Sequence, residues 1–140
     1  MNPHYVSVLF LAAQTVVAAP ATTLPAAVER AFDLYSALPS ELLPTLREAQ
    51  DKTSADKVAG KLHKKLLHIY NTREAVHKMP ALTAEQARIV EARYAHRMRS
   101  EWAKMYEEIE RLRLARCYES AELWKEFRTM CMIIWKKLKT

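Results

Sequence analysis

Apolar residues recur at helical spacing along most of the chain after residue 25. Between residues 55 and 69 they lie three or four positions apart and share one helix face: Ala55, Val58, Leu62, Leu66 and Ile69. The pattern predicts a helix over 54–79, with Thr53 and Ser54 supplying a capping hydroxyl. Pro80 ends this helix, because proline disfavours helical geometry in the residue before it. Arg73 interrupts the apolar face.

The helical pattern is longest over residues 83–116. Thr83 and Gln86 have the spacing of a capping box. The apolar residues that follow keep the helical spacing: Ala87, Val90, Tyr94, Met98, Trp102, Met105, Ile109 and Leu112. A helix of about 33 residues is roughly 50 Å long. In so small a chain, it must pack lengthwise against a partner helix.

Two short helices are expected before residue 51. Pro39 separates a helix over 26–38 from one over 41–50. Ser40 is the predicted cap of the second helix. Pro44 falls near its first turn, where a missing N–H group is tolerated.

The C-terminal part of the chain loses helical periodicity near Tyr118. Ser120 is the predicted cap of a last helix over 121–138. One continuous helix from Thr83 to Lys139 is the alternative. In either case residues 22–140 are expected to form a single all-α domain, an elongated antiparallel helical hairpin or bundle with coiled-coil-like packing around one long helix.

The N-terminal segment contains no Asp, Glu, Lys or Arg before Glu29. Its apolar run, residues 5–19, has the length of a signal-peptide hydrophobic region and is shorter than the roughly 20 residues that span a bilayer. Small residues favour cleavage after Ala21. Residues 1–21 are therefore interpreted as a signal peptide, and the mature protein as periplasmic or secreted. A retained N-terminal helix, buried or membrane-associated, is the alternative.

Composition excludes several kinds of site. The chain of 140 residues contains one Gly and two Cys, too few for a glycine-rich phosphate loop, a disulfide scaffold or a four-cysteine zinc site. His63 and His68 are five positions apart and lie on different helix faces. The sequence therefore assigns no catalytic, cofactor-binding or metal-binding residues and favours a non-enzymatic protein.

Charge is unevenly distributed along the chain, whose net charge is +6. Residues 22–51 carry five acids and two bases, whereas residues 52–79 carry two acids and seven bases. Basic side chains gather opposite the apolar face of the helix over 54–79: Lys57, Lys61, Lys64, Lys65 and His68. This face is a candidate site for an anionic partner, either an acidic protein or a membrane surface. A solvated face, partly neutralised by the acidic N-terminal arm, is the alternative. No RNA-binding motif or zinc-finger spacing is present, so nucleic acid is not an expected partner.

Methionine and tryptophan residues form a candidate surface for contacts with other proteins, whether clients or a second copy: Met98, Trp102, Met105, Trp124 and Trp135. Such side chains supply adaptable apolar surface. The alternative is that they fill the core or a homodimer seam.

The two cysteines, Cys117 and Cys131, are fourteen residues apart. With a turn at 118–120, Cys131 lies roughly 16 Å along the last helix. A disulfide needs Cα atoms within about 7 Å, so an internal bond is not expected. Cys117, near the turn, is a candidate intermolecular thiol.

The segment Leu82-Thr83-Ala84-Glu85-Gln86 resembles the Leu-Thr-x-x-Gln motif of the Spy/CpxP family. The resemblance implies an exported helical protein of the bacterial envelope that binds unfolded clients or a sensor domain, with Leu82, Thr83 and Gln86 in a structural capping role. The longer stretch from Leu46 to about Met130 resembles small exported bacterial helical proteins of unknown function. Together they lead us to expect an exported protein-binding module, holdase-like or linked to envelope stress. A membrane-surface protein with a retained N-terminal anchor and a basic lipid-facing helix is the alternative.

Overall fold

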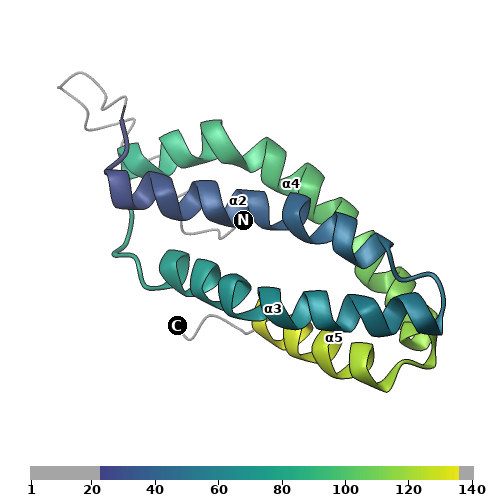
Figure 1. Ribbon diagram of the computed structural model, residues 1–140. Helices are drawn as coiled ribbons and strands as arrows, with labels where there is room; N and C mark the ends of the chain where they lie inside the picture. The colour runs from purple at the N-terminus through teal and green to yellow at the C-terminus, as the bar shows by residue number, and fades with distance from the viewer. Residues whose placement is uncertain (1–22, 136–140) are drawn as a thin grey trace, which may run out of the picture.

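The computed structural model describes residues 23–135, and these form four α-helices and a short turn (Figure 1). The helices are α2 (Ala26–Arg47), α3 (Lys52–His77), α4 (Ala84–Leu114) and α5 (Ala121–Ile134), with η1 (Arg116–Glu119) between the last two. The all-α prediction is confirmed. The predicted signal peptide, and the end of the predicted last helix beyond residue 135, lie outside the described residues.

Consecutive helices run antiparallel, but of these pairs only α2 and α3 pack side by side, and α4 is joined to α5 through η1 (Figure 1). The other helix contacts are parallel, because α2 packs along α4 and α3 packs along α5. Hydrogen bonds join Leu46 to Arg111 and Asp56 to Ser120, pairs that are 65 and 64 residues apart. The α2–α4 and α3–α5 contacts therefore join residues separated by nearly the same distance along the chain. α2 also packs against α3.

The predicted break at Pro39 is wrong, because α2 continues as one helix through Pro39 and Pro44. Neither proline can donate a hydrogen bond to the carbonyl four residues earlier, and an internal proline costs about 3 kcal/mol or more. Burial explains why the helix persists. Leu38 and Leu42 are each 1% exposed and Leu46 is fully buried, so one apolar face runs along the core on both sides of Pro39.

Three caps define the helix starts. Thr83 and Gln86 form the predicted capping box of α4, and Ser120 accepts a hydrogen bond from the Leu123 N–H at the start of α5. The predicted cap of α3 is corrected. Asp51 is the cap, and its carboxylate accepts from the Ser54 N–H at 2.7 Å while the Ser54 hydroxyl accepts from the Asp51 N–H at 3.0 Å.

The η1 turn separates α4 from α5, so the alternative of one continuous helix to Lys139 is wrong. All four of its residues have positive φ angles, from 50° to 61°. Left-handed geometry costs roughly 1–2 kcal/mol for each non-glycine residue. The chain thus reverses direction through a strained turn.

All four helices contribute to the main core. Its fully buried side chains include Leu46, Leu62, Ile69, Met105, Leu112, Leu123 and Met130. A smaller cluster lies near the start of α2, where the rings of Phe32 and Tyr94 stack with centroids 5.7 Å apart. There the Tyr94 hydroxyl donates to Asp33 at 2.6 Å. Desolvation, followed by the bond to Asp33, raises the pKa of Tyr94.

Candidate functional site: the groove between α3 and α5

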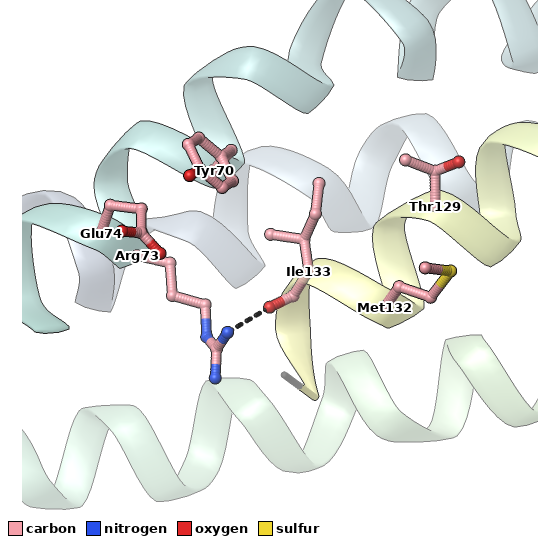
Figure 2. A pocket seen from close by; sticks show the side chains of 6 residues that line it. All are labelled: Tyr70, Arg73, Glu74, Thr129, Met132 and Ile133. Carbon is pink, nitrogen blue, oxygen red and sulfur yellow. Dashed lines mark hydrogen bonds between the residues drawn. The ribbon is translucent and has the colours of Figure 1, made fainter. Parts of the chain in front are cut away.

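A groove lies on the outside of the bundle where α3 meets α5. It has a volume of about 340 Å³ and is lined by Tyr70, Arg73, Glu74, Thr129, Met132 and Ile133 (Figure 2). We call it the α3–α5 groove. Its volume falls within the roughly 300–1,000 Å³ typical of ligand pockets.

Arg73 closes one end of the α3–α5 groove. Figure 2 shows its side chain reaching from α3 to the end of α5, where Nη1 donates to the Ile133 carbonyl oxygen at 2.5 Å. The last carbonyls of a helix lack partners within the helix, and arginine is well suited to satisfy them. This bond explains why the apolar face of α3 is interrupted at Arg73.

Large apolar side chains remain exposed around the α3–α5 groove. Met132 is 70% exposed and Tyr70 is 40% exposed, and both line it. Leu67, one helical turn before Tyr70, is 68% exposed. Leu67 and Tyr70 were not among the residues that the sequence pattern indicated as a contact surface. The available signal was that Leu67 and Tyr70 are apolar but fall outside the buried face of their helix.

The predicted protein-contact residues are divided between the core and the surface. Met105 is fully buried and Trp102 is 8% exposed, so both fill the core, as the alternative interpretation held. Met98 is partly buried against both apolar clusters. Trp124 and Trp135 are about half exposed, at 41% and 48%.

Trp102 belongs to a chain of aromatic rings that links three helices. Its ring centroid lies 5.6 Å from that of Tyr35 in α2 and 5.9 Å from that of Tyr106. Tyr106 in turn stacks on Trp135, at the end of α5, with centroids 5.8 Å apart. Desolvation is the main cause that raises the pKa of Tyr35. The buried Trp102 indole N–H has no hydrogen-bond partner within the described part of the chain.

The predicted basic face of α3 is partly neutralised by α2. The Lys61 ammonium lies 2.6 Å from the Glu48 carboxylate, and the His68 Nε2 lies 3.1 Å from Glu41. Lys65 is partly buried. Lys57 and Lys64 are exposed and form no ion pair with any residue in the 23–135 range. Lys61 and His68 therefore fit the interpretation of a face neutralised by acidic residues, whereas Lys57 and Lys64 could still meet an anionic partner.

Cys117 is fully buried, which places the candidate intermolecular thiol inside the molecule. Burial raises its pKa from 9.0 to about 11. Burial, and then the charge of Cys117, raise the pKa of Cys131 to about 11 as well. A thiol reacts as its thiolate, so neither cysteine is an activated nucleophile, and Cys117 cannot bridge two chains unless the turn opens.

Two polar contacts hold α5 on α3 between the groove and the η1 turn. The Ser120 hydroxyl donates to the Asp56 carboxylate. Nδ1 of His63 lies 3.1 Å from the carboxylate of Glu126, which is 8% exposed. Within residues 23–135, no group of three or more His, Cys, Asp or Glu side chains could hold a metal ion.

A second pocket, of about 440 Å³, lies at the η1 turn and is lined by Arg116, Glu119, Ser120, Ala121 and Trp124. Trp124, predicted as a protein-contact residue, is at this pocket and not at the α3–α5 groove. The two exposed tryptophans of α5 therefore do not belong to one site.

No helix among the described residues is long and apolar enough to cross a membrane. Comparison with protein-family models, with curated proteins and with solved structures finds no match.

Proposed function

We propose that this protein is an exported, non-enzymatic helical module that binds other proteins through the α3–α5 groove, in the manner of a holdase. The observation that carries the proposal is the exposure of Leu67, Tyr70 and Met132 around a groove that could receive an apolar side chain. Exposed apolar patches on soluble proteins commonly mark interaction sites.

The composition of the groove supports binding of varied partners. Met132 is flexible and polarizable, and methionine surfaces adapt to different apolar shapes. Tyr70 offers a ring with a polar tip, a combination that is common in interfaces. Arg73 and Glu74 add charged groups at the rim.

Suppression of client aggregation tests this proposal. The full chain is mixed with a chemically denatured model client, and aggregation of the client is followed by light scattering. The wild-type chain is compared with the variant Leu67→Ser/Met132→Ser. Loss of suppression in this variant is the expected result. Leu114→Ser is the matched control, because Leu114 is 70% exposed at the far end of α4. Equal loss in the control variant, or no loss in either, would contradict the proposal.

The membrane-surface alternative is favoured by a different observation, the exposed lysines Lys57 and Lys64. In that case the chain would bind anionic vesicles in a salt-sensitive way. Lys57→Gln/Lys64→Gln would weaken vesicle binding, and client binding would be unchanged. Absence of vesicle binding by the form that lacks residues 1–21 would remove the lipid role for this face.

A further inference from the structure

Backbone strain is concentrated in the η1 turn between α4 and α5. All four of its residues have positive φ angles and none of them is glycine: Arg116, Cys117, Tyr118 and Glu119. In this geometry the Cβ atom of each residue crowds the carbonyl oxygen that follows it. Residues 81–134 contain neither glycine nor proline, so the residues of the turn can also continue as a helix. The covalent chain therefore permits a straight connection between α4 and α5.

The main neighbour of α5 is α3. α5 packs along α3 and contacts η1, whereas the backbones of α4 and α5 make no close approach within residues 23–135. Three polar contacts between α5, or the cap that begins it, and α3 repeat this pattern: Ser120 with Asp56, Glu126 with His63, and the Ile133 carbonyl with Arg73. The stacked rings of Tyr106 and Trp135 link α5 to α4. The partner that α5 needs most is therefore a copy of α3, which a second chain also carries.

Opening of the η1 turn would allow two chains to exchange α5. In each chain α4 and α5 would then form one helix over residues 84–134, about 75 Å long. Two such chains related by a two-fold axis remake every α3–α5 contact between them. Opening loses the Ser120 cap of α5 and the hydrogen bond from Arg111 to Tyr118. In return, it relieves four left-handed residues in each chain.

We infer that two copies of this chain associate by exchanging α5, so that α5 of one copy packs on α3 of the other. The inference goes beyond the proposed function and does not depend on it. In the exchanged dimer both copies contribute to each α3–α5 groove. One copy supplies Tyr70, Arg73 and Glu74, and the other supplies Thr129, Met132 and Ile133. The monomer thus has one such groove and the dimer has two, with the same lining.

Cross-linking distinguishes exchange of α5 from any other dimer. Nδ1 of His63 lies 3.1 Å from the Glu126 carboxylate across the α3–α5 contact. His63→Cys and Glu126→Cys are made in separate full chains that carry Cys117→Ala/Cys131→Ala, so each chain has one thiol. The two chains are mixed in urea, refolded together at high concentration and treated with a short bis-maleimide. Exchange should link one chain of each kind, and denaturing electrophoresis should show a band of twice the chain mass.

Variants of the turn should shift the equilibrium in opposite directions. Light scattering after size-exclusion chromatography gives the dimer dissociation constant of the unmodified chain and of each variant. Glu119→Gly favours the left-handed turn and disfavours a helix, and should raise this constant about tenfold or more. Ser120→Ala removes a cap that only the closed turn needs, and should lower it about tenfold. The matched controls Glu107→Gly and Thr83→Ala change α4 away from the turn and should leave it unchanged.

The outcomes decide the inference without reference to client binding. A linked pair of unlike chains, with opposite shifts in Glu119→Gly and Ser120→Ala, supports exchange of α5. Absence of a dimer at every concentration, in the unmodified chain and in Ser120→Ala, overturns the inference. A dimer whose unlike chains are not linked also overturns it and assigns the contact to two closed chains. The aggregation assay then decides the proposed function independently, because the groove has the same lining in both forms.

Discussion

The guanidinium of Arg111 lies against Tyr118: Nη1 donates to the tyrosine hydroxyl at 2.6 Å, and Cζ lies 5.9 Å from the ring centroid. The same guanidinium donates to the carbonyl oxygens of Leu46 and Ala49, at 3.0 and 2.9 Å. One side chain of α4 thus binds the carbonyls of Leu46 in the last turn of α2 and of Ala49 in the loop after it, and also contacts the η1 turn.

Replacing Arg111 should therefore destabilise the fold. Arg111→Met leaves the Leu46 and Ala49 carbonyls without these donors, and we expect a loss of about 2–3 kcal/mol in the free energy of unfolding. Arg111→Lys should lose most of the same amount, because an ammonium cannot reproduce the planar fork. Urea denaturation measures both. Arg113→Met is the control and should change little, since its partner Glu110 is exposed; an equal loss there would contradict the assigned role.

A substitution in the left-handed η1 turn should instead stabilise the fold. Glu119 is exposed and has a φ of 61°, a geometry that glycine adopts without a steric penalty. Glu119→Gly should therefore raise the free energy of unfolding by about 1 kcal/mol. The matched control Glu107→Gly, at an exposed right-handed position in α4, should lower it by about 1 kcal/mol. A thermal melt in which both variants lose stability would contradict a left-handed η1 turn.

The continuity of α2 can be tested at its second proline. Pro44 lies inside α2 and is exposed, so replacing it removes little packing. Pro44→Ala restores a donor for the carbonyl of Ser40 and should stabilise the protein by roughly 1–3 kcal/mol. If α2 instead ended near Pro39, Pro44 would lie in a first turn, and Pro44→Ala would leave the melting temperature almost unchanged.

Stability should fall at alkaline pH through the thiols of the buried Cys117 and the partly buried Cys131. Their pKa is raised from 9.0 to about 11 in the fold, so the unfolded chain loses these protons first as pH rises. The cysteines therefore contribute their full stability below pH 9.0, and that contribution is lost as pH rises to about 11. Urea midpoints across this range should fall less steeply for Cys117→Ala/Cys131→Ala. The slope that remains would belong to Tyr35 and Tyr94, whose pKa values are also raised.

Processing of the N-terminus is a further prediction. If residues 1–21 are a signal peptide, the protein recovered from its own cell begins at Thr22, and its intact mass shows the loss of that segment. A chain that still begins at Met1 would contradict cleavage and would move the membrane-surface alternative ahead. The same measurement without reductant should show a single chain, because Cys117 is buried.

Local sequence signals were sufficient where the structure depends on neighbouring residues. The capping box of Thr83 and Gln86 and the cap at Ser120 need only side chains within three residues of the backbone groups they satisfy. Proline was misleading for the opposite reason. Its local penalty at Pro39 is set against burial of the whole leucine face of α2 in contacts with other helices, and those contacts are not visible in the local pattern.

The candidate site was only partly predictable. The basic residues of α3 were found by spacing, but their pairing with Glu41 and Glu48 depends on how α2 crosses α3. Arg73 stood out in the sequence because it interrupts an apolar helix face. Its hydrogen bond to the Ile133 carbonyl oxygen, however, depends on where α5 ends. Cys117 was expected at the surface because turns usually are exposed, and the left-handed turn instead buries it.

The parallel packing of α3 and α5 also affects how the chain folds. The contacts that join them link residues 60 to 64 positions apart, whereas an antiparallel hairpin closes over a short loop. Such long closures lose more entropy before they gain contacts, which slows folding. Until α5 has been synthesised, the apolar side of α3 that packs against it is exposed to solvent. A nascent chain would expose this seam, and it would then need a chaperone of its own or be prone to aggregation.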